Sequence, residues 1–166
     1  MEMIEFNLLK AEIEAQVKEI ERIYNEVEDR ERGAQASKAK LESLGYQLHN
    51  LYCAFEYLFK IVACCFENRI LGMLSKDSTQ CKVLLRRITL SVEGLRPPLI
   101  SNEAYRELDE LRAFRYFFRH AYSYELRYEK VKIPLDSARR LKGLYQKDIA
   151  QFLDTVEKEI DRPSCD

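Results

Sequence analysis

Residues 41–62 read LESLGYQLHNLYCAFEYLFKIV, and large apolar side chains recur along this stretch at intervals of three and four residues. This spacing places them on one face of an α-helix. The side chains that define the face are Leu41, Leu44, Leu48, Leu51, Phe55, Leu58 and Val62. Gly45 interrupts the pattern, at a cost of roughly 1 kcal/mol relative to alanine that a long packed helix tolerates. We therefore predict a buried helix that continues to about residue 70.

The segment before it has the same period but an acidic composition. Apolar side chains from Phe6 to Val27 recur at helical spacing, and most other positions are glutamate, lysine or arginine. Gly33 is the breaker, so we expect a first helix over residues 3–32. The two helices should form a long antiparallel hairpin.

Turn and cap residues divide the remainder of the chain. A third helix is expected to end near residue 90, and the consecutive prolines of the segment 93–98 exclude a helix there. Ser101 should cap a fourth helix over residues 101–124. Pro134 is expected to stop the next stretch, and Asp136 to cap a final helix. Since no alternating strand pattern is visible, the predicted fold is an all-α antiparallel bundle of about five helices.

The overall composition narrows the class of protein. The chain has 166 residues with only 5 Gly and 4 Pro, which argues against collagen-like, low-complexity and loop-rich β proteins. No apolar run approaches the roughly 20 residues needed to cross a membrane, and the acidic N-terminus does not resemble a signal peptide. The 5 cysteines do not suggest a secreted disulfide framework. We expect a single domain over residues 1–166 in a cytoplasmic protein without membrane contact.

Cysteine and histidine do not form a recognisable metal site. The sequence contains no Cys-x-x-Cys pair, no phosphate-binding glycine loop and no carboxylate cluster of metal-site type. We therefore expect neither a metal nor a cofactor. His49 lies among apolar residues and is interpreted mainly as a histidine at the margin of the core, whereas His120 has unusual neighbours.

Residues 111–124 read LRAFRYFFRHAYSY, which contains three arginines, one histidine and no acidic residue. The window also holds six of the 18 Phe and Tyr residues of the chain. On a helix, Arg112, Arg115, Arg119 and Tyr122 share a face, whereas His120 is offset from Arg115 by about 140°. A straight helix would not direct both side chains to one small target. An aromatic core helix with a solvated basic edge explains this composition equally well.

Arg115 and His120, with four residues between them, and then Tyr122 match the Arg-x4-His-x-Tyr motif of HepT-type toxins in the HEPN superfamily. The flanking residues 111–122 also resemble that family, as does the stretch 48–60, and the likeness covers roughly residues 35–160. The resemblance implies an all-α HEPN-like fold. It also implies a metal-independent endoribonuclease, the toxin of a type VII-like toxin–antitoxin system.

The resemblance assigns roles to individual residues. Arg115 would orient the scissile phosphate and stabilise its extra negative charge, and His120 would transfer protons during attack by the RNA 2′-hydroxyl group. The family acts as a homodimer whose motif helices line one cleft. A partner nucleotidyltransferase of the MNT type would neutralise the toxin by transferring AMP to Tyr122, which would fill the cleft with a phosphodiester anion.

The sequence also offers candidates for further RNA contacts. Arg112 and Arg119 are candidate phosphate ligands, although either could pair with an acidic residue of its own helix. Asn50 and Glu56 are the polar residues of the second helix that we expect to face the cleft. Two alternatives stay open: a non-catalytic HEPN subunit that binds substrate for, or docks on, a nucleotidyltransferase, and a helical adaptor in which residues 4–31 pair with a partner helix.

Overall fold

The computed structural model describes residues 1–67, 78–120 and 125–161. These ranges contain five helices: α1 (Met3–Glu31), α2 (Lys38–Glu67), α3 (Ser78–Ile88), α4 (Asn102–Arg119) and α5 (Tyr128–Ile160). Within the described ranges the sole β-type pairing is an isolated bridge between Val92 and Arg96. The prediction of an all-α bundle is confirmed.

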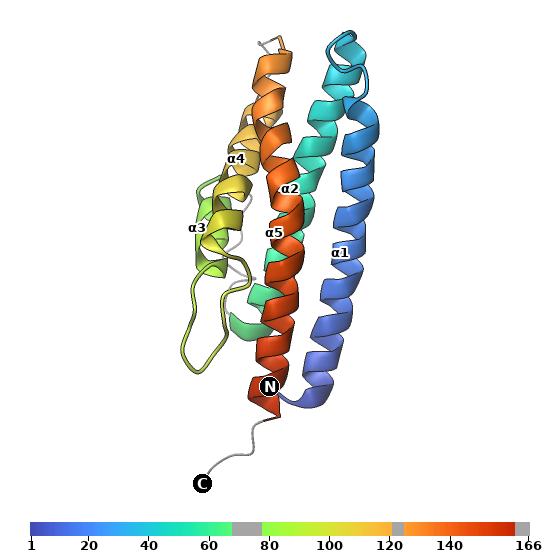
Figure 1. Ribbon diagram of the computed structural model, residues 1–166. Coiled ribbons are helices and arrows are strands. Elements are labelled where there is room, and N and C mark those ends of the chain that lie inside the picture. Colours follow the sequence, from blue (N-terminus) through green and yellow to red (C-terminus); the bar gives the residue numbers. More distant parts are fainter. Residues whose placement is uncertain (68–77, 121–124, 162–166) are drawn as a thin grey trace.

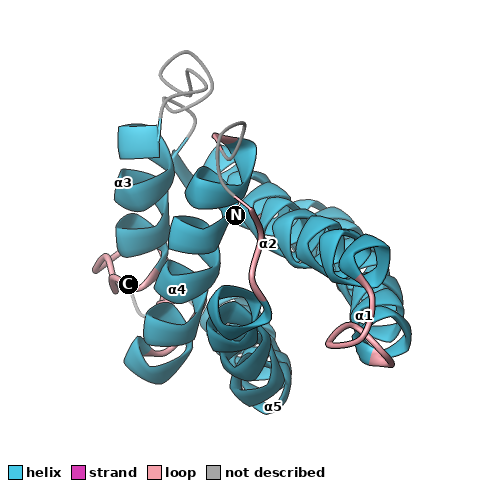
Figure 2. Ribbon diagram, turned by 90° about the horizontal axis from the view of Figure 1, so that it is seen from above, coloured by secondary structure: helices cyan, strands magenta, loops and turns pink. Residues whose placement is uncertain are grey.

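The long helices α1 and α2 run antiparallel as a hairpin, and α5 lies alongside them. The shorter helices α3 and α4 lie on the side of α2 and α5 that faces away from α1 (Figures 1 and 2). α2 packs against each of the other four helices. Its predicted apolar face is buried at every position from Leu41 to Val62. The second helix is thus the centre of the core, as its sequence pattern predicts.

The apolar face of α1 is also buried, with Phe6, Ile13 and Ile20 fully inaccessible to solvent. α1 packs against α2 and α5 of the same chain. This face is therefore not available to a partner helix, which argues against the adaptor alternative.

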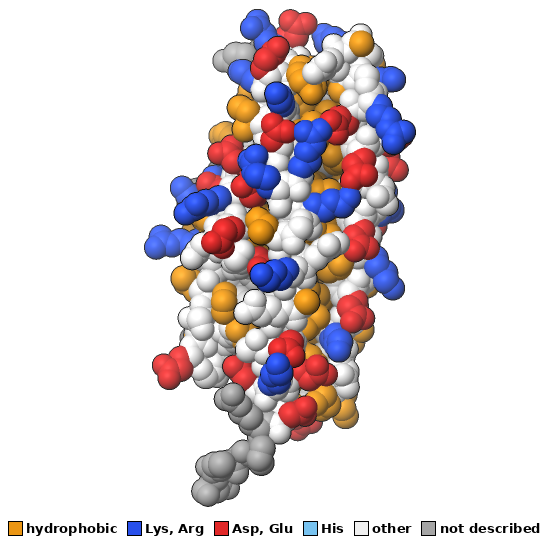
Figure 3. All heavy atoms as spheres, viewed as in Figure 1, with side chains coloured by type: hydrophobic (Ala, Val, Ile, Leu, Met, Phe, Trp, Pro, Cys, Tyr) orange, Lys and Arg blue, Asp and Glu red, His pale blue; other side chains and the backbone are white. Residues whose placement is uncertain are grey.

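Ion pairs connect α1 with α5. Glu28 pairs with Lys142, Glu31 pairs with Arg139, and Lys10 lies 3.9 Å from Glu157, all between α1 and α5. Figure 3 shows acidic and basic side chains interspersed over the surface of these two helices. Such exposed pairs contribute little individually to stability, and they lie near both ends of α1.

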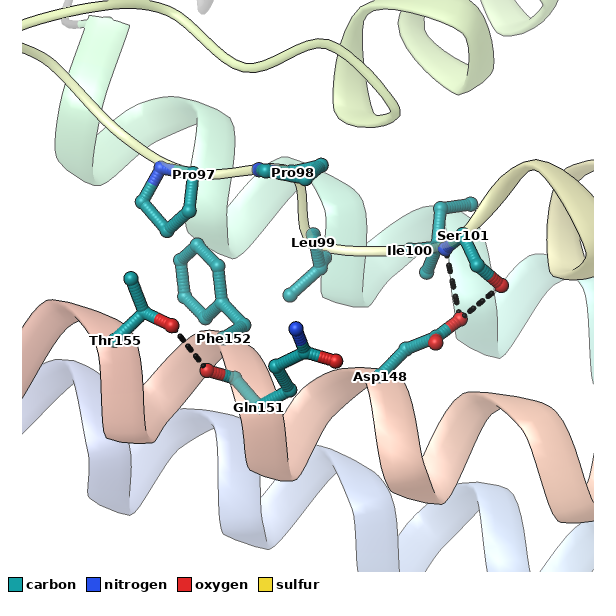
Figure 4. Close-up of a pocket in the computed structure, with 9 residues that line it drawn as sticks. All are labelled: Pro97, Pro98, Leu99, Ile100, Ser101, Asp148, Gln151, Phe152 and Thr155. Carbon is teal, nitrogen blue, oxygen red and sulfur yellow. Dashed lines mark hydrogen bonds between the residues drawn. The ribbon is translucent and has the colours of Figure 1, made fainter.

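The start of α4 is fixed by its predicted cap. The Ser101 hydroxyl accepts a hydrogen bond from the Ala104 backbone N–H at 3.2 Å. Asp148 of α5 in turn accepts hydrogen bonds from the Ser101 backbone N–H at 2.8 Å and from its hydroxyl at 2.7 Å. Figure 4 shows this contact beside a small pocket between the segment 97–101 and α5. The cap therefore also anchors the start of α4 to α5.

The prediction that Pro134 ends a helical stretch is wrong. α5 begins at Tyr128 and continues through Pro134, so Asp136 lies inside the helix and is not its cap. A proline in this position removes one backbone hydrogen bond. Because Val131, Pro134 and Leu135 are all buried, packing of the apolar face compensates for that loss.

The predicted end of the fourth helix also differs from the structure. α4 ends at Arg119 with His120 as its C-cap, whereas we expected the motif helix to reach residue 124. Residues 121–124, and the predicted end of the second helix near residue 70, lie outside the described residues. None of the helices described is both long and apolar enough to span a membrane.

Gly45 allows the end of α4 to approach α2 closely. A Cβ atom at this position would lie 2.9 Å from Cε2 of Phe118 and 3.2 Å from Cδ2 of Leu126. Gly143 is the opposite case, because a Cβ atom there would meet no atom within 4 Å. The space around the residue thus restricts a side chain at position 45 but not at position 143.

We predict opposite effects of the same substitution at these two positions. Gly143→Ala should raise the free energy of unfolding by up to about 1 kcal/mol through helix propensity. In Gly45→Ala, overpacking against Phe118, which typically costs about 1–3 kcal/mol, should cancel or exceed that gain. Urea denaturation of both variants measures the difference, and equal stabilisation would show that α2 and α4 are not in close contact at Gly45.

Candidate functional site

Arg115 extends from α4 towards α2 and α3. Its Nη1 atom lies 3.2 Å from the Glu56 Oε2 atom and donates a hydrogen bond to the Cys81 sulfur at 3.4 Å. The guanidinium group also lies over the ring of Tyr52, 5.7 Å from the ring centre. Three helices thus hold the motif arginine in one position.

Glu56 is buried, with 7% of its surface exposed. One carboxylate oxygen accepts a hydrogen bond from Lys60 at 2.6 Å, and the other accepts from the Cys81 thiol at 3.4 Å and faces Arg115. Within one chain the carboxylate is enclosed by these partners and faces Arg115. Direct contact of Glu56 with RNA stays a prediction.

Arg115 remains positively charged although its side chain is partly buried. Burial is the largest single influence and lowers the pKa of Arg115, but the negative charge of Glu56 and the contacts with Cys53 and Cys81 together outweigh it, so the net effect is a raised pKa. Arg115 is therefore a permanent cation fixed in a partly enclosed position. A cation of this kind can bind an anion without reorganising.

Unsatisfied polar atoms gather around this cation. In the described part of the chain, four buried side-chain N or O atoms find no hydrogen-bond partner, and three of them belong to His49, Tyr52 and Arg115. We call these residues, together with Glu56 and Cys81, the Arg115 cluster. Buried polar groups are satisfied in most native structures, so a concentration of exceptions is typical of a functional site.

His120 occupies the exposed C-cap position of α4. Its Nδ1 atom lies 2.8 Å from the backbone carbonyl oxygen of Tyr116, and the two rings lie 4.4 Å apart between centroids. Because a carbonyl oxygen only accepts hydrogen bonds, Nδ1 carries the proton in this contact. The Nε2 atom is then left for exchange of a proton with a ligand.

Arg115 and His120 do not converge within one chain. Arg115 faces α2 and α3, whereas His120 contacts Tyr116 at the end of α4. This separation agrees with the angular offset expected on a helix. One chain alone therefore presents the two motif residues in different directions.

The other candidate residues occupy varied environments. Arg112 pairs with Asp109 of its own helix at 2.7 Å, which is the alternative we considered for it, and Arg119 is exposed. Asn50 is half-buried on α2, whereas Tyr122 lies outside the described residues.

A family model describing HepT-like proteins matches residues 43–156. The chain belongs to the HepT-like family. The matched segment contains every candidate site residue and excludes α1. Neither the curated proteins nor the solved structures include a match to the chain.

Sequence reasoning missed two members of the Arg115 cluster in this HepT-like chain, Tyr52 and Cys81. Tyr52 precedes Glu56 by one helical turn, and side chains four residues apart lie together on a helix. The sequence could therefore have predicted that Tyr52 lies beside Glu56. Cys81 comes from α3, and no local pattern links it to Arg115. His49 was interpreted as a core-margin residue, and it is half-buried, with its ring 5.9 Å from that of Phe118.

His49 is held in its neutral form by its surroundings. Burial is the main factor that lowers the pKa of His49, and the positive charges of Arg115 and Arg119 lower it further. The unfolded chain therefore binds a proton at a higher pH than the native protein does. The contribution of His49 to stability is accordingly complete above about pH 6.5 and is lost as the pH falls towards the lowered pKa.

We predict that Arg119→Gln raises the pKa of His49, because the substitution removes a nearby charge from an exposed side chain. NMR titration of the imidazole signals measures this pKa, and His120→Gln assigns the two histidines. The loss of stability below pH 6.5 should also become smaller. Arg106→Gln, an exposed position of the same helix, serves as the control. An unchanged pKa in Arg119→Gln would show that Arg119 does not act on His49.

Proposed function

We propose that this HepT-like protein is a metal-independent endoribonuclease and the toxin of a type VII-like toxin–antitoxin system. The observation that carries the proposal is the Arg115 cluster. It holds the arginine of the Arg-x4-His-x-Tyr motif as a fixed cation between three helices. A phosphate oxygen is the kind of acceptor that a guanidinium group binds strongly.

The proposed reaction is a transesterification of RNA. The 2′-hydroxyl group loses its proton to a base and its oxygen attacks the adjacent phosphorus atom. The bond from phosphorus to the 5′-oxygen then breaks, and that oxygen takes up a proton. The products are a 2′,3′-cyclic phosphate and a free 5′-hydroxyl group, so that neither water nor an oxidant is consumed.

Each motif residue would perform one task in this reaction. Arg115 would stabilise the additional negative charge on the phosphate in the transition state. His120 would exchange a proton through Nε2, because Nδ1 is engaged by the Tyr116 carbonyl. Arg119, which is exposed, would bind a neighbouring phosphate group.

A homodimer would bring Arg115 and His120 together in one cleft. Arg115 and His120 face different directions in one chain, and a second subunit with its motif helix across the same cleft would supply the missing partner. Tyr122 would lie in that cleft and accept AMP from ATP, with loss of pyrophosphate, through a nucleotidyltransferase of the MNT type. The added phosphodiester anion would compete with RNA for Arg115.

One observation favours a second candidate function. The Glu56 carboxylate already occupies one side of the Arg115 guanidinium, and the Arg115 side chain is only 18% exposed. This arrangement also fits a non-catalytic subunit that docks on a nucleotidyltransferase and in which Arg115 only supports the fold. A stable complex with the nucleotidyltransferase, together with no RNA cleavage by the free protein, would support that function.

We expect His120→Ala to lower the rate of RNA cleavage by about 10²–10⁴-fold, the usual range for a general acid or base. Arg115→Lys should lower the rate of cleavage by about 10²–10³-fold. Lysine keeps the positive charge beside Glu56 but lacks the planar guanidinium group, which can donate two parallel hydrogen bonds to a phosphate. Cleavage of total RNA, with detection of cyclic phosphate ends in the presence of EDTA, measures both effects.

Controls are needed because Arg115 is also a packing residue. Arg115→Ala leaves a buried carboxylate without one of its two cationic partners and is expected to destabilise the protein by up to several kcal/mol, so circular dichroism must accompany each variant. Arg106→Ala, at an exposed position of α4, should leave cleavage unchanged. Equal cleavage by wild type, His120→Ala and Arg115→Lys would refute the proposed catalytic roles.

We further predict that incubation with ATP and the cognate nucleotidyltransferase adds one or more AMP units to the protein. Intact mass spectrometry detects the addition, and Tyr122→Phe should abolish it because the acceptor oxygen is absent. Tyr124→Phe, two residues away, is the matched control and should be modified normally. Modification of Tyr122→Phe to the same extent would show that another residue accepts AMP.

A further inference from the structure

Tyr116 is an exposed aromatic side chain in the middle of the motif. Its surface is 52% exposed, although the neighbouring aromatic residues Phe114, Phe117 and Phe118 belong to the core or pack against it. Its ring lies 4.4 Å from that of His120, with an angle of 37° between the planes. A tyrosine in this position is not required by the packing of α4.

Basic groups border the ring of Tyr116. On the helix surface Arg112 lies one turn before it, and Arg119 and His120 lie one turn after it. Arg119 is exposed, and Arg112 is half-buried beside Asp109. A flat ring between cations matches the chemistry of single-stranded nucleic acid, in which each planar base is followed by a phosphate group.

We propose that Tyr116 is the stacking platform for the nucleobase on the 5′ side of the scissile phosphate, and that the protein therefore cleaves RNA at unpaired nucleotides. The inference rests on the proposed ribonuclease function and defines its substrate class. The ribose of the stacked nucleotide carries the attacking 2′-hydroxyl group. A base on Tyr116 thus brings that hydroxyl group close to His120.

The same geometry excludes paired nucleotides from this position. In an A-form duplex each base is stacked between its neighbours, and protein side chains reach mainly the backbone and the shallow groove. A base must leave that stack before it can lie on Tyr116. Loops and single-stranded segments present such bases without the cost of unpairing.

The test combines a protein substitution with an RNA substitution at one mapped cleavage site. Wild-type protein, Tyr116→Phe and Tyr116→Leu are assayed on an oligonucleotide that spans the site. A second oligonucleotide carries an abasic ribonucleotide, with its 2′-hydroxyl retained, on the 5′ side of the scissile phosphate. Tyr57→Leu, at a tyrosine on α2 that is 59% exposed, is the matched control.

Stacking predicts a specific, non-additive pattern. On intact RNA, Tyr116→Phe should cleave within about twofold of wild type, and Tyr116→Leu about 5- to 150-fold more slowly, the range for loss of one base–aromatic stack. The abasic RNA should slow the wild type by a similar factor and Tyr116→Leu hardly further. A complementary strand that pairs the site should suppress cleavage by the wild type.

Additive losses from the two substitutions would overturn the proposal, because they would show that Tyr116 only supports His120. A change of oligomeric state in Tyr116→Leu, measured by analytical ultracentrifugation, would overturn it in favour of a contact with a second copy. Absence of cleavage by the wild type would instead refute the ribonuclease function itself. The two failures are thus distinguishable.

Discussion

The ion pair between Glu56 and Arg115 is the contact on which the candidate site depends. Taking both charges out of water is costly, and their attraction repays this only with good geometry and additional hydrogen bonds. Lys60, Cys81 and the ring of Tyr52 supply such contacts. As a result α2, α3 and α4 meet at one charged point, and the position of the motif arginine is set by the core and not by solvent.

Most of the fold could be predicted from hydrophobic spacing. The seven apolar positions between Leu41 and Val62 are all buried, and the Ser101 cap is formed as expected. These features are local, so they are visible in one stretch of sequence. Pro134 was misjudged because the loss of one backbone hydrogen bond is a local penalty, whereas the burial of its neighbours depends on the complete bundle.

Less of the site was predictable. The motif identifies Arg115, His120 and Tyr122 as a group, but a linear sequence does not state which way a polar side chain of a packed helix turns. Glu56 lies 59 positions before Arg115, so no helical spacing relates them. The proximity of Cys81 likewise arises only when α3 packs against α4. Residue types and motif spacing thus predicted a site, and tertiary packing determined its partners.

The anchoring of α4 has a mechanical consequence. The helix has 18 residues and is therefore about 27 Å long. Contacts with other helices hold it at two points, because Asp148 binds Ser101 and Glu56 pairs with Arg115. His120 lies beyond the second of these points, at the C-terminal end of the helix. A tilt of about 2° over that length moves the far end by about 1 Å, a displacement large enough to cost about 10²-fold in rate. Two contacts that lie far apart along the helix limit that tilt more effectively than either could alone.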